Sequence, residues 1–282
     1  MTNYIRRWWL LFLIPTLAAF AIGFIVPFAE GLYLSFCNFT TIKKVDFTGF
    51  ENYLKALEDP AFRQAFLFTV SFTVVSTLLI NVAAFAIALA LTGKMRGTNT
   101  FRTVFFMPNL IGGIVLGFIW NILINGVLSA LEQPLLALNS TAGYWGLIIL
   151  MCWQQIGYMM IIYIAGLQSI PSSYLEAASI DGASRWQTLW KVKIPNVMPS
   201  ITICLFLTLT NSFKLFDQNL ALTGGDPNHT TDMLALNIYN DFYTGSARFR
   251  GVGQAKAVIF CVMVIVIALI QLRATRSKEV QQ

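Results

Sequence analysis

The stretch Glu176-Ala-Ala-Ser-Ile-Asp-Gly-Ala-Ser-Arg-Trp-Gln-Thr-Leu-Trp-Lys-Val-Lys-Ile-Pro195 is polar and amphipathic, although it lies between long hydrophobic runs. Gly182 lies where a helix end needs a residue that tolerates a positive φ. Pro195 ends the helical pattern that follows. We therefore expect two short helices joined by a sharp turn and held at a membrane surface. A membrane protein that keeps two such helices outside the lipid is expected to present them to a partner.

Two capping boxes are predicted at the starts of these helices. Ser173 with Glu176, and Ser184 with Gln187, have the spacing at which two side chains satisfy free N–H groups of a first helical turn. Each pair marks a helix start, so the segment predicts one helix on either side of Gly182.

The composition is that of a membrane protein. Of the 282 residues, 56% are hydrophobic and 11% are charged, against roughly 25% charged residues in soluble domains, and the mean hydropathy is +0.66. Six runs reach the roughly 20 apolar residues that span a bilayer. The first is too long for a cleaved signal peptide, so we expect it to be retained. The sequence predicts an all-α, polytopic membrane protein, a single domain over residues 1–282, with spans at about 8–34, 66–91, 104–124, 144–167, 201–222 and 252–272.

The basic residues predict the orientation. With six spans, four clusters fall on one side, namely Arg6 and Arg7; Lys94, Arg96 and Arg102; Arg185, Lys191 and Lys193; and Arg273, Arg276 and Lys278. The positive-inside rule makes that side cytoplasmic, and with it both termini and the loop at about 168–199. The first outside loop fits this rule less well, because it carries Lys43, Lys44, Lys55 and Arg63. Topology accounts for the net charge of +6, so no nucleic-acid partner is needed to explain it.

The sequence carries no recognisable catalytic motif. It has no phosphate-binding loop of the form G-x-x-x-x-G-K-[ST], no H-E-x-x-H and no G-x-S-x-G. The four cysteines are scattered without metal-ligand spacing, and the lone His229 is expected to be a solvated loop residue. We expect no metal and no cofactor in this chain. Any ATPase that powers it is another polypeptide.

The amphipathic segment resembles the EAA loop of permease subunits in bacterial ABC importers. The residues that match this loop, or that we assign to ATPase coupling with it, are Glu176, Ala177, Ala178, Asp181, Gly182, Val192, Ile194 and Pro195. Val192 and Ile194 depart mildly from the family pattern. Five further motifs are similar to the carbohydrate-importer branch of the family, of the maltose and glycerol-phosphate type: Tyr33–Phe36, Gly49–Tyr53, Phe101–Pro108, Ala165–Pro171 and Leu222–Pro227.

The resemblance implies a type I ABC importer permease in the bacterial inner (cytoplasmic) membrane, surrounded by lipid. Such a permease pairs with a second permease subunit, as a heterodimer in our interpretation. Two ATP-binding subunits, which bind ATP and Mg, dock on the cytoplasmic side, and an extracytoplasmic solute-binding protein docks opposite. Closure of the ATPases is transmitted through the coupling loop (about residues 168–199), and the permeases alternate between inward- and outward-facing states around a sugar solute.

Polar residues within the spans are candidates for the solute path, because polar groups in lipid usually face a cavity. In the fifth span, Asn211, Lys214 and Gln218 share a helical face, with Asp217 beside Lys214. The third and fourth spans add Asn109, Trp120, Asn121, Gln154, Gln155 and Tyr158. The alternative is that Lys214 pairs with Asp217 and the amides join helices. Lys256 in the last span is expected to snorkel to the outer surface.

Other functions stay open on the residues alone. A secondary transporter or a channel would also have six apolar spans, but it would be expected to carry acidic residues within them for ion coupling. A membrane-embedded enzyme would need clustered His, Asp or Ser residues at one face of the membrane. An ABC permease for a non-sugar solute, such as glycerol phosphate, is a further alternative.

Overall fold

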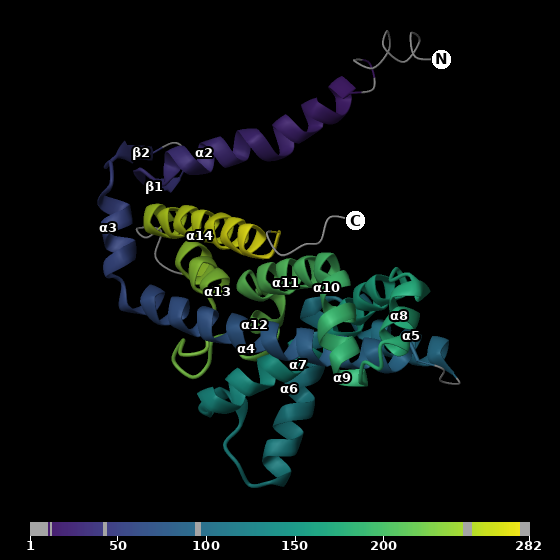
Figure 1. Cartoon of the computed structure of the whole chain (residues 1–282). Helices are drawn as coiled ribbons and strands as arrows, with labels where there is room; N and C mark the ends of the chain where they lie inside the picture. Colours follow the sequence, from purple (N-terminus) through teal and green to yellow (C-terminus); the bar gives the residue numbers. More distant parts are fainter. Residues whose placement is uncertain (1–10, 12, 42–43, 94–96, 245–249, 277–282) are drawn as a thin grey trace. The chain divides into compact units, whose positions relative to one another are not determined.

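The computed structural model describes residues 11, 13–41, 44–93, 97–244 and 250–276. The chain divides into two compact units, of which the first holds residues 1–62 and 238–260 and the second holds 63–237 and 261–282. Helices α4 (Pro60–Leu91) and α14 (Arg250–Arg276) contribute to both units (Figure 1). Of the residues that we used for orientation or for span ends, Arg6, Arg7, Trp8, Lys43, Lys94, Arg96 and Lys278 lie outside the described residues.

The first unit begins with an apolar helix over Leu13–Leu34, which includes a π-helical turn, η1 (Ala21–Ile25), and α2 (Val26–Leu34). A small antiparallel hairpin follows, of β1 (Cys37–Thr41) and β2 (Lys44–Phe47), with Cys37 opposite Phe47. Helix α3 (Glu51–Glu58) leads into α4, and η5 (Asn240–Thr244) precedes α14. The hairpin is an addition to the helices expected from the sequence.

One buried amide joins three elements of the first unit. The Asn52 Nδ2 atom of α3 donates to the backbone oxygens of Ser35, at 3.1 Å, and of Cys37, at 2.9 Å. Helix α14 approaches the same place at Gly251, where an added Cβ would lie 2.3 Å from the Cys37 oxygen and 2.8 Å from Asn52 Nδ2. A side chain at residue 251 would therefore push α14 away from the hairpin.

Lys256 does not snorkel to the surface, so that expectation is wrong. Its side chain is 1% exposed, and its Nζ makes ion pairs with Asp59 and Asp241, each 29% exposed. It also lies 5.3 Å from the centre of the Phe62 ring. Inside the first unit, the two carboxylates take the place that water at the membrane surface would have around the ammonium group. Burial raises the pKa of Asp59, but the hydrogen bond and charge of Lys256, with backbone N–H donors, outweigh it and hold this pKa below its ordinary value.

The second unit has helices and loops, and no strand, among its described residues. Besides its part of α4 it contains α5 (Thr98–Phe106), η2 (Met107–Leu110), α6 (Gly113–Ala130), η3 (Leu136–Leu138), α7 (Ser140–Gln168), α8 (Ser172–Ile180), α9 (Arg185–Thr188), η4 (Leu189–Lys193), α10 (Ile194–Asn196), α11 (Met198–Phe213), α12 (Asp217–Leu222) and the start of α13 (Leu234–Tyr239).

Helix α7 is the centre of this unit. It contacts α5, α6, α11 and α12 (Figure 1), and most of its apolar residues belong to one buried core with residues of α4 and α11. Buried hydrogen bonds add direction to this packing. The Tyr163 hydroxyl donates to Asn81 Oδ1 at 2.6 Å, and Asn81 Nδ2 donates to Thr208 Oγ1 at 2.8 Å, which ties α7 to α4 and α4 to α11.

Five described helices are long and apolar enough to cross a membrane, and the count rises to six if the bent pair 185–196 and 198–213 is one span. Two expected spans have different boundaries. The third, expected at 104–124, is interrupted at 107–112, and its membrane-length helix is Gly113–Ala130. The fifth, expected at 201–222, is divided into α11 and α12.

Close packing holds the short helix α12 against α6. A Cβ on Gly113 would lie 2.7 Å from the Asp217 Cβ, and one on Gly117 would lie 2.7 Å from the Ala221 Cβ. The spacing G-x-x-x-G lets two membrane helices approach at this distance. Helix α12 is too short to be stable on its own, and the close approach that the two glycines allow stabilises it against α6.

We predict that Lys256→Met destabilises the protein by about 3–5 kcal/mol, because it leaves two carboxylates without their cation. Thermal unfolding of the purified protein in detergent measures the loss. Lys55→Met is the matched control, since Lys55 pairs with Glu51 at a site where both side chains are 55% exposed, and such pairs contribute about 0–1 kcal/mol.

The triple variant Lys256→Met, Asp59→Asn, Asp241→Asn should recover part of the stability. In the unmutated protein, Asp59 contributes to the free energy of unfolding at pH values above its ordinary pKa of 3.8. This contribution is lost as the pH falls through the lower pKa that Asp59 has in the folded protein. Equal melting temperatures for the Lys256 and Lys55 variants would contradict the prediction.

Candidate functional site

The turn at Gly182 has the geometry expected from the sequence. Its φ is +73°, and the backbone N–H of Ala183 donates to the Ala178 oxygen at 2.9 Å, while that of Gly182 donates to the Ser179 oxygen at 3.2 Å. This pair of hydrogen bonds is the Schellman motif, which ends a helix with a left-handed residue. The motif aims the chain from α8 into α9.

The second helix of the segment starts as predicted. The Gln187 backbone N–H donates to Ser184 Oγ at 3.2 Å, and the Ser184 N–H donates to Gln187 Oε1 at 2.8 Å, so this capping box is confirmed. The helix continues through the π-turn η4 and α10, and then bends by 71° into α11. The coupling loop thus runs directly into a helix of the core.

The first predicted capping box, Ser173 with Glu176, is wrong. Helix α8 begins at Ser172, its N-cap is Pro171, and no side chain caps it. Proline already has the backbone angle that suits a helix start, so the helix begins before Ser173 can act as its cap. Glu176 is exposed and caps no helix, so of its two predicted roles the capping role is excluded, and ATPase coupling stays a prediction.

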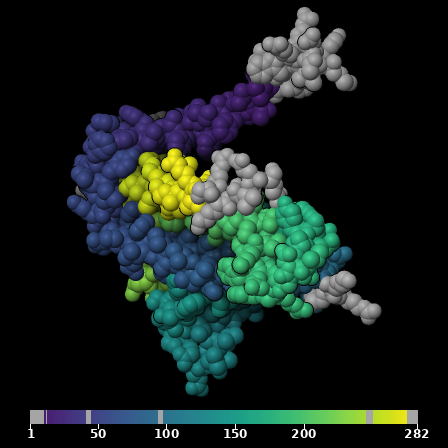
Figure 2. Space-filling view, viewed as in Figure 1, coloured from purple at the N-terminus to yellow at the C-terminus, as the bar shows by residue number. Residues whose placement is uncertain are grey.

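Large apolar side chains are exposed along the coupling loop. Ile180 is 86% exposed, Trp186 67% and Trp190 54%, and the two indole rings are 5.6 Å apart in an edge-to-face contact. The segment lies at the surface of the second unit, in green in Figure 2. Clustered exposed tryptophans are typical of interaction sites, so this surface is suited to dock a protein.

A second feature lies where the fifth expected span is broken. Helix α11 ends at Phe213 and α12 starts at Asp217, and the break opens a cavity of about 320 Å³, which we call the 211–218 cavity. It is lined by Met151, Gln155, Asn211, Lys214, Leu215, Phe216, Asp217 and Gln218. The predicted face of Asn211, Lys214 and Gln218 is thus brought together by a break rather than by a continuous helix.

The cavity presents polar groups that are available to a ligand. Gln155 is 9% exposed, and its Oε1 has no hydrogen-bond partner among the described residues. Lys214 and Asp217 are both exposed. Both are described by the structure, and none of its ion pairs joins them, so the alternative that they pair with each other is wrong.

The remaining path candidates lie outside this lining. Gln154 joins helices, because its Nε2 donates to the Ile111 oxygen at 3.2 Å and its Oε1 accepts from Gln218 Nε2 at 2.8 Å. Asn121 donates to the Leu222 oxygen at 2.6 Å. These two amides therefore join helices, as the alternative expected. Tyr158 packs near the Phe106 ring, Trp120 lines an apolar groove between α6 and α7, and Asn109 lies in η2.

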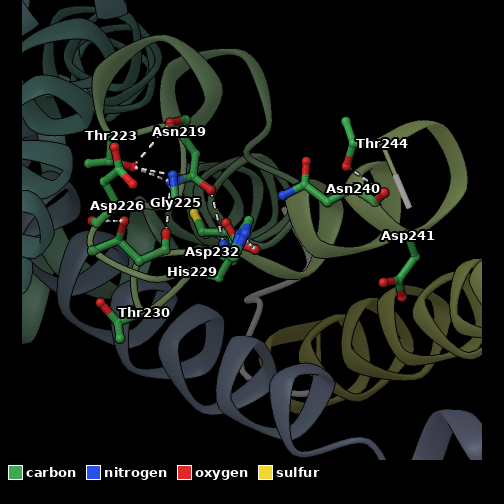
Figure 3. A network of polar contacts seen from close by, with 12 residues as sticks. Asn219, Thr223, Gly225, Asp226, His229, Thr230, Asp232, Asn240, Asp241 and Thr244 are labelled. Atoms are coloured by element: carbon green, nitrogen blue, oxygen red, sulfur yellow. Dashed lines mark hydrogen bonds and ion pairs between the residues drawn. The ribbon is translucent and has the colours of Figure 1, made fainter. Parts of the chain in front are cut away.

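A compact loop follows α12 (Figure 3). The buried Asn219 donates through Nδ2 to the Thr231 oxygen and accepts at Oδ1 from the Met233 N–H, both at 2.9 Å. His229 Nδ1 lies 3.0 Å from Asp232 Oδ2, and the ring is 66% exposed, which fits the expected solvated loop histidine. Sequence reasoning did not find this anchoring, because nothing in the sequence marks Asn219 as the residue that closes the loop.

Comparison with known proteins decides the family. Residues 95–277 match the model of the binding-protein-dependent transport system inner membrane component. The chain belongs to this family. It is 43% identical, over 97% of its length and 96% of the relative's, to a probable starch degradation products transport system permease protein, AmyD, of Thermoanaerobacterium thermosulfurigenes. It is 33% identical to the multiple sugar-binding transport system permease protein MsmF of Streptococcus mutans, over 98% and 97% of the two chains.

A solved structure shows the same fold. It is a crystal structure of a bacterial ABC transporter involved in the import of the acidic polysaccharide alginate, with a TM-score of 0.82, 22% identity and 98% of each chain covered. The chain is therefore a membrane-embedded permease of the ABC-importer type, which confirms the predicted family and fold. The secondary transporter, channel and membrane-enzyme alternatives are set aside.

We predict that Gly182→Val leaves the permease in the membrane but impairs its association with the ATPase subunits and its uptake activity. A Cβ at this φ costs about 1–2 kcal/mol, and the space around Gly182 is open, so the strain re-aims α8 rather than disturbing the core. Co-purification of the ATPase and cellular uptake are measured together.

Gly182→Asn is the matched control, because asparagine accepts left-handed angles more readily than valine. It should retain most of the association and uptake. Normal uptake by the Val variant, with its ATPase bound, would show that the turn is an ordinary surface loop.

We also predict that Glu176→Gln and Glu176→Ala reduce uptake to the same extent, while each changes stability by no more than about 0.5 kcal/mol. The reason is that Glu176 caps no helix, so the loss of charge that the two variants share decides their effect. Ser173→Ala should change neither quantity. Uptake assays and thermal unfolding provide both readouts, and a larger stability loss for Glu176→Ala than for Glu176→Gln would restore the capping role.

Proposed function

We propose that this permease subunit imports a sugar or an oligosaccharide. The observation that carries the proposal is the 211–218 cavity, which lies where a membrane helix is broken. It is lined by Gln155, whose buried Oε1 has no hydrogen-bond partner among the described residues, and by further polar side chains. Transporters bind solutes at such interruptions, because the freed polar groups line a cavity instead of facing lipid. The names of AmyD and MsmF, for starch degradation products and multiple sugars, support the same solute class.

The chemistry of the cavity suits hydroxyl groups. Gln155 Oε1 accepts a hydrogen bond from a hydroxyl, and Asn211 can both donate and accept. Lys214 and Asp217 supply one positive and one negative charge, so the charged side chains of the lining carry no net charge. A neutral polyol fits this balance better than glycerol phosphate, whose dianion would meet Asp217.

The working cycle that we propose joins this cavity to the coupling loop. Two ATP-binding subunits, which hold ATP and Mg, dock on the exposed surface of α8 and α9, and a second, different permease completes the path. A solute-binding protein delivers the solute from the opposite side. The coupling residues are those named above, Glu176, Ala177, Ala178, Asp181, Gly182, Val192, Ile194 and Pro195. Movement of this segment reaches the cavity through α11, which begins directly after it and ends at Phe213, next to Lys214 of the lining.

The orientation is part of the proposal. The Lys and Arg distribution supports cytoplasmic termini and a cytoplasmic coupling loop. A cysteine placed at the exposed Ser184, in a cysteine-free background, should react with an impermeant maleimide only after cell lysis. Reaction in intact cells would overturn this topology.

The solute proposal is tested by uptake in cells that express the complete transport system, starting with malto-oligosaccharides. We predict that Gln155→Leu lowers uptake by about tenfold, because a hydrogen bond of about 1.5 kcal/mol is lost. Trp120→Phe is the control, since Trp120 lines a groove elsewhere on α6 and α7. Uptake of amino acids or glycerol phosphate, but of no sugar, by the unmutated system would refute the sugar assignment.

A further inference from the structure

A second polar cavity lies at the opposite end of α7 from the coupling loop. It has a volume of about 420 Å³, and we call it the 140–144 cavity. Its lining comes from the start of α4, the first turns of α7 and the loop after α12, and consists of Gln64, Phe68, Ser140, Thr141, Tyr144 and Thr230. No function described above uses it.

The cavity combines an ordered aromatic wall with available hydrogen-bonding groups. The Tyr144 ring is held between Phe68, 5.4 Å away, and Trp145, 5.6 Å away, both at interplanar angles of 83°. In the part of the chain that the structure describes, neither the Tyr144 hydroxyl nor the side-chain amide of Gln64 makes a hydrogen bond. Aromatic rings that pack on apolar C–H groups, beside amides and hydroxyls that bond to hydroxyl groups, form a surface complementary to a pyranose.

The third wall of the cavity is also fixed in place. The Thr230 hydroxyl donates to the Pro227 oxygen at 2.7 Å, and the loop that carries it is anchored by Asn219 (Figure 3). Helix α7 packs tightly against this loop, because a Cβ on Gly143 would lie 3.1 Å from the Thr231 methyl carbon. Because these walls are already ordered, the protein loses little conformational entropy when a ligand binds.

The two cavities share one face of α7. Met151 and Gln155 follow Tyr144 by seven and eleven residues, so each lies within about 20° of Tyr144 around the helix axis, one on either side of it. Tyr144 and Gln155 are separated by about 16 Å along the axis. Ile148, which lies between them on this face, is 2% exposed and Met151 is 0% exposed, so packed side chains separate the two cavities in this conformation.

We propose that the 140–144 cavity is a carbohydrate-binding subsite, which holds a sugar unit before it reaches the 211–218 cavity. This inference rests on the proposed sugar import and adds to it a second binding position on the solute path. An oligosaccharide would engage its aromatic wall with one unit, and that unit would reach the 211–218 cavity when the permease changes state in the transport cycle proposed above.

The test uses the complete transporter, with its ATPase subunits and binding protein, reconstituted in nanodiscs. A diazirine derivative of maltotriose is photoactivated during turnover, and the cross-linked peptides are identified by mass spectrometry. We expect labelling of the Gln64–Phe68 and Ser140–Tyr144 segments, in competition with unlabelled maltotriose. Tyr144→Leu should reduce this labelling about fivefold, whereas Tyr144→Phe, which keeps the ring, should retain most of it.

Trp153→Leu is the matched control, because this exposed aromatic residue lies on the opposite side of α7 from Tyr144. It should leave both the labelling and the basal ATPase activity unchanged. Labelling confined to the 211–218 cavity, with normal uptake, would overturn the subsite and leave sugar import intact. Absence of uptake and of labelling at both cavities would instead refute the proposed function, and the subsite with it.

Discussion

The second unit depends on a buried set of hydrogen bonds centred on Asn81. Its Oδ1 accepts from the Tyr163 hydroxyl, and its Nδ2 donates to Thr208 Oγ1 and to the Thr77 backbone oxygen. Within a membrane, no water is available to satisfy such groups, so each finds its partner within the protein, either on its own helix or on a neighbouring one. Bonds of this kind contribute about 0.6–2 kcal/mol each, and they also fix which faces of α4, α7 and α11 meet. The cavities on α7 keep their shape because this register is fixed.

Polar groups in the second unit serve two different purposes. Those that join helices make hydrogen bonds within the protein. Gln154, for example, donates to the Ile111 oxygen and accepts from Gln218. Those that face a cavity are left available, as Gln155 is, one residue further along the same helix. Adjacent positions on a helix are rotated by about 100°, so one turn of α7 supplies both a structural amide and a binding amide. The interruptions at 107–112 and 214–216 are tolerated because Gln154 and the close glycine contacts of α6 hold the broken ends.

The coupling loop follows the opposite logic. Its helices α8 and α9 are short, and their ends are secured by local devices, a Schellman motif and a capping box, rather than by burial. Their largest exposed apolar residues are Ile180 and Trp186. A segment that is ordered by its own turns, and not by the core, can present a stable surface to a partner and still pass a displacement into α11.

The sequence by itself determined the features that depend on local chemistry. Long apolar runs predicted the membrane helices, the position of Gly182 predicted a left-handed turn, and Ser184 with Gln187 predicted a helix start, because each of these follows from residues close together in the chain. Motif order and spacing predicted the family.

Only the tertiary structure decided the features that depend on distant residues. Ser173 was displaced as a cap by Pro171, and the broken third and fifth spans could not be read from hydropathy, because an apolar run does not show where a neighbouring helix will supply a hydrogen bond. Lys256 looked like a snorkelling residue until the fold placed Asp59 and Asp241 beside it, 197 and 15 residues away in sequence. The cost of a buried charge or a broken helix is set by what surrounds it, and those surroundings exist only once the chain has folded.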